Sequence, residues 1–170
     1  MKTFLISDTH FGHANVLNFT IADGSKLRPG FDNIYEHDEY LIEQWNKVVG
    51  VNDKVYHLGD VGFKNFTALS AILSRLNGTK VLIKGNHDNF KISQYAQHFK
   101  DVRATHQLDG VILSHIPLHE DSLNRWKGNI HGHLHNRTLA DNRYVNVSVE
   151  CLINYAPVDF EGLREYYKDL

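Results

Sequence analysis

The sequence predicts a single α/β domain of three or four layers that covers residues 1–170, on three observations. The first half of the chain alternates short apolar runs with amphipathic segments, a pattern typical of parallel strands joined by helical crossovers. The second half carries further short apolar runs without long helices between them, which indicates a second sheet. No repeat, low-complexity segment or linker divides the chain.

The expected elements of the first half are three strands and two helices. Each strand is a short apolar run that stops at a polar loop. Each helix has apolar residues at helical spacing and ends near a glycine. The strands are expected over residues 2–7, 55–58 and 81–83, and the helices over 34–49 and 66–76, after a short helical turn at 14–19 and a turn-rich segment at 20–33.

The second half is expected to be rich in strands and to end in a helix. Asp109-Gly110 is a hairpin signal, because both residue types accept the positive φ angles of a tight turn. The strands are expected over 102–106, 111–113, 128–130 and 144–149, and the helix over 158–168.

Composition limits the function classes. Hydrophobic residues make up 42% of the chain, which is enough for a sizeable core. The formal net charge of −2 argues against a basic nucleic-acid clamp. Cys151 is the only cysteine and cannot form an internal disulfide, and the apolar stretch at the N-terminus is too short for a signal peptide or membrane span. We therefore expect a cytoplasmic protein without membrane association.

Polar clusters follow the apolar runs at five places. The carboxyl ends of parallel strands face a common crevice, so these clusters are expected to converge although they lie far apart in sequence. Each cluster alone is a weak signal, but five in this order are hard to explain as turns. The clusters are Asp8-Thr9-His10, Gly59-Asp60, Gly85-Asn86-His87-Asp88, Ser114-His115 and Gly132-His133-Leu134-His135.

These residue types favour divalent metal ions. Asp supplies a hard oxygen ligand, Asn an amide oxygen and His a borderline nitrogen. Asp8 and His10 are two residues apart, as are His133 and His135, so in extended backbone both members of each pair point to one side and reach one ion.

In their order and spacing, the five clusters resemble the calcineurin-like metallophosphoesterase family, in particular its small single-domain bacterial and phage-type members. The resemblance covers residues 8 to 135. It implies a layered β-sandwich with mixed sheets flanked by helices. It also implies a dinuclear-metal-dependent hydrolase that cleaves a phosphomonoester or phosphodiester by direct attack of a hydroxide shared by the two ions.

The resemblance also implies roles for individual residues. Asp60 bridges the two ions, His87 contacts the phosphate and protonates the leaving oxygen, and Asp88 orients His87. The oxygen and nitrogen ligands are compatible with manganese, which is the metal that we expect first, and also with iron, nickel or zinc. The first ion is held by Asp8, His10, Asp60 and His135, and the second by Asp60, Asn86, His115 and His133.

The substrate is expected to be a phosphorylated small molecule or a nucleotide. His13 and Arg28 are candidate substrate contacts, His13 because it follows the first cluster and Arg28 because a guanidinium binds phosphate in bidentate geometry. Family members often carry Asp or Arg a few residues after the bridging Asp, whereas here Asp60 is followed by Val61-Gly62-Phe63. This departure leaves a common substrate-side contact unfilled.

Two other functions remain open. A nuclease or nucleic-acid end-processing phosphatase ranks second among enzymes, because the chain has neither the length for an added capping domain nor a basic surface. A non-catalytic metal-binding scaffold for protein interaction is the alternative of another class, and it does not require the full ligand set that this chain retains. The sequence does not indicate the oligomeric state.

Overall fold

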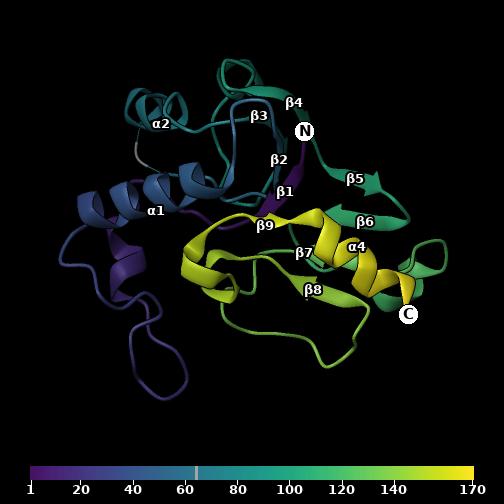
Figure 1. Ribbon diagram of the computed structural model, residues 1–170. Helices are drawn as coiled ribbons and strands as arrows, with labels where there is room; N and C mark the ends of the chain where they lie inside the picture. The colour runs from purple at the N-terminus through teal and green to yellow at the C-terminus, as the bar shows by residue number, and fades with distance from the viewer. Residues whose placement is uncertain (64) are drawn as a thin grey trace.

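The computed structural model describes residues 1–63 and 65–170 and contains two mixed sheets (Figure 1). The first sheet consists, in order, of β4 (Phe99–Arg103), β3 (Thr79–Ile83), β2 (Lys54–His57), β1 (Thr3–Ile6) and β9 (Val158–Asp159). The second consists of β5 (Thr105–Leu108), β6 (Val111–Ser114), β7 (Asn129–His131) and β8 (Tyr144–Asn146). Only β9 in the first sheet and β5 in the second run antiparallel to their neighbours.

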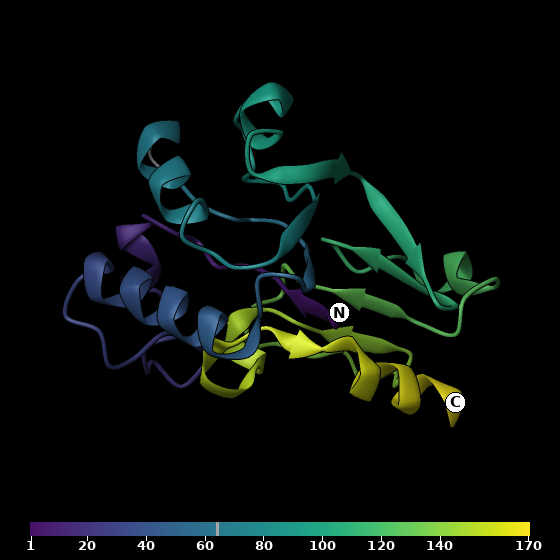
Figure 2. The ribbon, with the colours of Figure 1, turned by 45° about the horizontal axis from the view of Figure 1, so that its top comes forward.

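The helices α1 (Ile34–Val48) and α2 (Phe66–Leu73) lie together on one side, away from the second sheet (Figures 1 and 2). Asn33 begins α1, because its side chain accepts a hydrogen bond from the backbone N–H of Glu36 at 3.0 Å. Successive residues of a strand point to opposite faces of a sheet, so β1 divides its side chains between two cores. Phe4 and Ile6 pack with the helices, and Leu5 packs with the second sheet.

The core between the sheets also receives α4 (Phe160–Lys168), which contributes Phe160 and Tyr167. The first sheet thus has α1 and α2 on one face and the second sheet on the other. The remaining elements are short: η1 (Ala14–Asn18), α3 (Ile92–Tyr95), η2 (Glu120–Leu123), η3 (Val149–Cys151) and η4 (Ile153–Tyr155). Among the described residues, no helix has the length and apolar character needed to cross a membrane.

The structure confirms the α/β class, the two mixed sheets with flanking helices and the hairpin at Asp109-Gly110, where φ is 43° and 86°. Four expected elements are wrong in detail. The helix expected over 66–76 ends at Leu73, and the strand expected over 144–149 ends at Asn146. The strand expected over 102–106 is two strands in different sheets, because the chain leaves β4 at Arg103 and enters β5 at Thr105. The expected terminal helix begins at Phe160, because the two residues before it pair with β1 as β9.

Gly128 offers a test of how tightly α4 packs on β7. A Cβ atom at this position would lie 2.2 Å from Cε1 of Tyr167 and 2.3 Å from the carbonyl oxygen of Arg143. We expect Gly128→Ala to lower the free energy of unfolding by about 1–3 kcal/mol through overpacking. Gly162→Ala is the matched control, since nothing lies within 4 Å of its Cβ position in α4, and we expect a gain of about 0.5–1 kcal/mol. Urea unfolding measures both; an unchanged midpoint for Gly128→Ala would contradict the packing.

Candidate metal centre

The predicted metal ligands lie at the carboxyl ends of five strands from the two sheets. Asp8 and His10 follow β1, Asp60 follows β2, and Asn86 follows β3. From the second sheet, His115 follows β6, and His133 and His135 follow β7. The contacts below join all seven side chains into one cluster, as the strand-end rule predicts.

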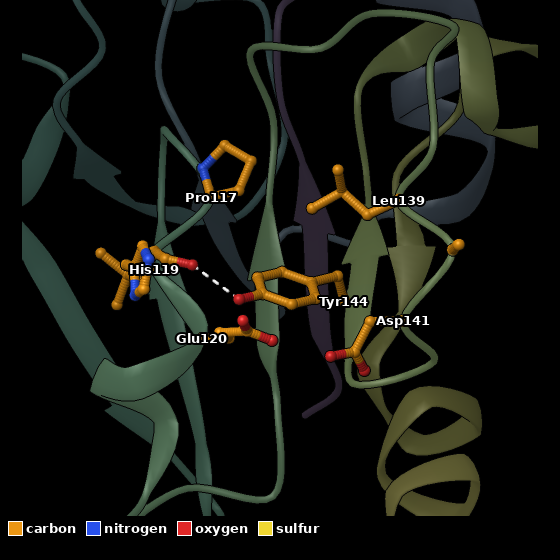
Figure 3. A pocket seen from close by; sticks show the side chains of 8 residues that line it. Pro117, His119, Glu120, Leu139, Asp141 and Tyr144 are labelled. Atoms are coloured by element: carbon orange, nitrogen blue, oxygen red, sulfur yellow. Dashed lines mark hydrogen bonds between the residues drawn. The ribbon is translucent and has the colours of Figure 1, made fainter.

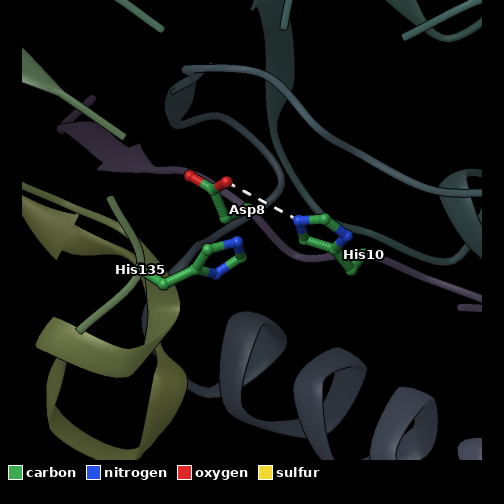
Figure 4. A group of neighbouring side chains, drawn as sticks. All are labelled: Asp8, His10 and His135. Carbon is green, nitrogen blue, oxygen red and sulfur yellow. Dashed lines mark ion pairs between the residues drawn. The ribbon is translucent and has the colours of Figure 1, made fainter. Parts of the chain in front are cut away.

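The first part of the cluster consists of Asp8, His10 and His135 (Figure 4). Each offers one ligand atom, and these atoms all lie within 4.8 Å of one another. Oδ1 of Asp8 and Nε2 of His10 are 3.6 Å apart. These distances suit three groups that share one cation.

The second part is centred on Asp60. Ligand atoms of Asp8, Asp60 and His115 also lie within 4.8 Å of one another. Oδ2 of Asp60 lies 3.5 Å from Nε2 of His115 and 3.8 Å from Nε2 of His10. Asp60 therefore stands between the two parts, which is the position that a bridging carboxylate requires.

Asn86 closes the second part. Its Oδ1 lies 2.9 Å from Nε2 of His115 and 3.0 Å from Nδ1 of His133. Asn86 is exposed, whereas His115 is buried, so this side of the cluster opens to solvent.

Two atoms of the cluster test whether its residues fit a metal ion. Oδ1 of Asp8 and Nε2 of His10 are buried and have no hydrogen-bond partner among the described residues. A buried polar atom without a partner is costly, and a cation between these two atoms would satisfy both. The Asp, Asn and His donor set also fits a divalent ion.

Hydrogen bonds on the far side of two histidine rings direct their free nitrogens into the cluster. Nδ1 of His115 donates to the carbonyl oxygen of Leu58 at 2.7 Å, and Nδ1 of His135 donates to Oε1 of Glu150 at 2.9 Å. A hydrogen bond at one ring nitrogen fixes the tautomer and leaves the other as a metal ligand. In both residues the nitrogen that remains for a metal ion is Nε2.

Asp8 is held through its other oxygen. Oδ2 accepts hydrogen bonds from Ser7 Oγ at 2.7 Å, from Ser148 Oγ at 3.0 Å and from the backbone N–H of His133 at 2.8 Å. The close approach of this backbone to the Asp8 carboxylate requires Gly132, where a Cβ atom would lie 2.4 Å from Oδ2. Oδ1 is thereby fixed toward His10.

Backbone strain is concentrated at the cluster. Eight non-glycine residues have a positive φ angle in the described part of the chain, and five of them are predicted ligands. Such residues cost about 1–3 kcal/mol each and gather at functional sites, where the surrounding structure holds them in place. They are Asp8 (58°), His10 (51°), Asp60 (53°), His133 (68°) and His135 (53°).

The electrostatics of the cluster favour added positive charge. Burial acts to raise the pKa of Asp8, but the His10 imidazole at 3.6 Å and the nearby His115 outweigh burial and lower it. Burial acts to lower the pKa of His115, but Asp60 and Asp8 outweigh burial and raise it. The carboxylates thus stay ionised at neutral pH in a buried site, where opposite charge stabilises them strongly.

His87 lies at the solvent side of the cluster. It is exposed, and its ring centroid is 6.4 Å from that of His10. Its backbone N–H donates to Oδ1 of Asp60 at 2.9 Å, which fixes the start of the side chain beside the cluster. This position is compatible with the expected contact to a substrate.

Asp88 differs from the expectation that it orients His87. It is fully buried, and its carboxylate accepts backbone N–H groups from Gly85 at 2.8 Å, Asp60 at 2.9 Å and Val61 at 2.9 Å. The side chain therefore ties the loop after β2 to the loop after β3. A positioning role for the Asp60 loop replaces the expected role beside His87.

Arg28 also differs from its expected role as a substrate contact. It is 1% exposed, and its guanidinium donates to the carbonyl oxygen of Asp8. It also donates to the carbonyl oxygen of Thr9 and to Oε1 of Glu150, each at 2.9 Å. No face remains for a phosphate. His13, by contrast, is half-buried, and its Nδ1 lies 3.2 Å from Nδ1 of His10.

His37, which no sequence signal marks as part of the site, is fully buried. Its Nε2 accepts from Arg28 at 2.9 Å, and its Nδ1 donates to Asp38 at 2.8 Å. Asp38 in turn accepts the backbone N–H of Gly12 at 2.8 Å, so this chain of contacts anchors the first ligand loop to α1. Glu150, which contacts both His135 and Arg28, likewise carries no spacing signal in the sequence.

Two cavities lie near the ligand loops. One of about 290 Å³ is lined by Asn86 and His115, together with Lys84, and so adjoins the cluster. The other, of about 530 Å³, lies between the segments of His119 and Asp141, with the Tyr144 hydroxyl donating to the Leu118 carbonyl oxygen at 2.7 Å (Figure 3). No predicted ligand lines the second cavity.

Fold and site together define a protein of two mixed sheets with a cluster of Asp, Asn and His side chains where the strand ends meet. The chain belongs to the family of the uncharacterized protein MJ1445 of Methanocaldococcus jannaschii, with 37% identity over 171 residues that cover 94% of this chain and 88% of the relative. The Gene 66 protein of Mycobacterium phage D29 is 29% identical over 99% of this chain and 97% of its own length. No family model matches the chain.

A solved structure shares the fold. The crystal structure of the protein of unknown function AQ665 from Aquifex aeolicus matches 96% of this chain and 98% of its own, with a TM-score of 0.74 and 22% identity. At this identity, the likeness extends to the fold alone.

The burial of Arg28 leads to a test of its role. We expect Arg28→Met to lower the free energy of unfolding by about 3–5 kcal/mol, because one partner of a buried ion pair is left uncompensated. Arg125→Met, at an exposed arginine, is the control and should change stability by no more than about 0.5 kcal/mol. Denaturant unfolding measures both. A variant as stable as the parent would contradict the structural role.

Proposed function

We propose that this protein is a dinuclear-metal-dependent phosphoesterase with the calcineurin-like fold. The observation that carries the proposal is the place of Asp60, whose Oδ2 lies within 4 Å of His10 on one side and of His115 on the other. A carboxylate between two sets of ligands holds two cations close together, and two-metal sites of this kind are typical of phosphatases and nucleases.

The residues that would hold the two ions fall into two sets that share Asp60. The unpartnered Oδ1 of Asp8 and Nε2 of His10 support the first set, and the contacts of Asn86 Oδ1 support the second. When bound, two divalent ions supply Lewis-acid polarisation of the phosphate and lower the pKa of a water molecule. Manganese remains our first choice, with iron, nickel or zinc also compatible. The sets are Asp8, His10, Asp60 and His135, and Asp60, Asn86, His115 and His133.

The protein's own groups supply the rest of the chemistry. His87 is exposed beside the cluster and carries ring nitrogens suited to protonating a leaving oxygen. Asp88 positions the Asp60 loop, and Arg28 positions the Asp8 loop. The substrate is a phosphorylated small molecule or nucleotide that reaches the cluster from the side where Asn86 and His87 are exposed.

Substitutions within the cluster separate metal binding from catalysis. We expect Asp60→Asn and Asn86→Ala to lose bound metal and hydrolysis together. His87→Ala should keep its metal and lose about 10²–10⁴-fold in rate, the usual contribution of a general acid. His119→Ala, at an exposed histidine outside the cluster, is the control. Elemental analysis and turnover on each purified variant check these outcomes, and a fully active Asp60→Asn protein would rule out the two-metal scheme.

A substrate panel distinguishes an enzyme from a binding scaffold. We expect the protein loaded with manganese to hydrolyse a chromogenic phosphomonoester or phosphodiester, and a chelator to remove this activity, because the metals polarise the phosphate. Re-addition of manganese should restore it. Stoichiometric metal binding without turnover on any ester would favour the scaffold, and turnover confined to nucleic acids would favour a nuclease.

A further inference from the structure

Three aromatic side chains stand in a row beside the candidate metal centre. The ring centroid of Phe63 lies 5.1 Å from that of His10 and 5.3 Å from that of His87. His13 stacks on Phe63 at 4.0 Å with an interplanar angle of 20°. Phe19 meets His13 at 5.6 Å and is 39% exposed. We call Phe63, His13 and Phe19 the aromatic wall.

The backbone fixes the aromatic wall to the ligand loops. The N–H of Phe63 donates to the carbonyl oxygen of Phe11 at 2.8 Å, and the N–H of His13 donates to that of His10 at 3.1 Å. The carbonyl oxygen of Phe19 accepts from Leu27 at 2.8 Å. The rings are thus held by the segment that carries the first predicted ligands, and little ordering is required when a ligand binds.

The position of the wall decides what it can bind. In the proposed function His87 protonates the leaving oxygen, so the leaving group lies next to His87 and therefore against Phe63. The faces of Phe63 and Phe19 offer no hydrogen bonds to a sugar or a polyol. His13 already covers one face of Phe63. The partly exposed remainder of Phe63 and the exposed ring of Phe19 offer flat apolar surface, on which a planar ring stacks in an offset or edge-on arrangement.

We propose that the aromatic wall binds a planar aromatic ring of the leaving alcohol, so that the substrate is a phosphate ester of a nucleoside or of another alcohol that carries an aromatic ring. This inference rests on the proposed function and names its substrate class. It accounts for Phe63 at the place where the family resemblance leads one to expect a charged residue.

Pairs of substrates with matched leaving alcohols test the inference. Benzyl and cyclohexylmethyl phosphate differ in the planarity of one ring, and adenosine 5′-monophosphate and ribose 5-phosphate differ in the base. With manganese, we expect the parent to prefer the aromatic member in kcat/KM by roughly ten- to hundredfold, the usual range for stacking of one base. Preference for benzyl but not for adenosine would assign the wall to small aromatic alcohols; preference within both pairs would include nucleosides.

Substitutions in the aromatic wall test whether its side chains cause the preference for aromatic substrates. Phe63→Leu keeps an apolar side chain without a flat face, so it should lower kcat/KM for benzyl phosphate more than for cyclohexylmethyl phosphate and bring the ratio of the two close to one. Phe63→Tyr should retain the preference. Metal content is measured on each, because Phe63 lies beside His10. Phe19→Leu, at an exposed ring that is not in contact with His10, should reduce the preference in part and provides a second variant.

A binding measurement separates failure of this inference from failure of the proposed function. Calorimetry with benzylphosphonate and cyclohexylmethylphosphonate, which are not hydrolysed, should show tighter binding of the benzyl compound to the metal-loaded parent and equal binding to Phe63→Leu. Equal binding of the two by the parent, or equal weakening of both in Phe63→Leu, would overturn the inference. Tighter benzyl binding without hydrolysis of any ester would instead overturn the proposed enzymatic function and leave the aromatic wall intact.

Discussion

Asp8 and Asp60 place two carboxylates in the same buried pocket, where their side chains are 0% and 2% exposed. Two negative charges so close repel each other, and burial makes the repulsion stronger than it is in water. Positively charged and hydrogen-bonding groups around the two carboxylates offset this repulsion. His10 and His115 face the carboxylates, and Arg28 donates to the carbonyl oxygen of Asp8. A site of this kind has a physical reason to bind cations that does not depend on any resemblance.

Two buried charged side chains position the ligand loops, and they do so in complementary ways. The Asp88 carboxylate accepts backbone N–H groups from the loops after β2 and β3. The Arg28 guanidinium donates to backbone carbonyl oxygens of the loop after β1. The Asp88 carboxylate binds donors and the Arg28 guanidinium binds acceptors, and together they hold three loops. Two of these loops have strained backbone, at Asp8, His10 and Asp60. Both side chains therefore act on the ligands through the main chain.

The sequence predicts the candidate ligands better than it predicts their supports. The ligands directly follow apolar runs, and the strand-end rule brings such residues together whatever their distance along the chain. Glu150 and His37 carry no such signal, because their roles come from tertiary contacts to His135 and Arg28. The expectations for Arg28 and Asp88 had the same weakness. The charge of Arg28 suggested phosphate binding, and the family resemblance assigned Asp88 to His87, while burial decides which partners are present.

The fold shows the same division between local and tertiary signals. The hairpin at Asp109-Gly110 is encoded by residues that accept positive φ, so it is readable from the sequence. The change of sheet between Arg103 and Thr105 is not, because apolar periodicity continues across it and does not state which neighbour a strand pairs with. The two-residue strand β9 is too short for any periodicity, and only its pairing with β1 defines it.

In the proposed function, the ligand cluster and its surroundings contribute differently to substrate recognition. Carboxylates and histidines around two cations recognise a phosphate group whatever it is attached to, so discrimination has to come from groups outside the cluster. We propose Phe63 as such a group, because it contacts the cluster through His10 and extends the site through His13. An apolar ring at this point also keeps water from one side of His10, which strengthens the electrostatic interactions within the cluster. In our proposal Phe63 therefore contributes to ion binding through its contact with His10 and to substrate choice through its stack with His13.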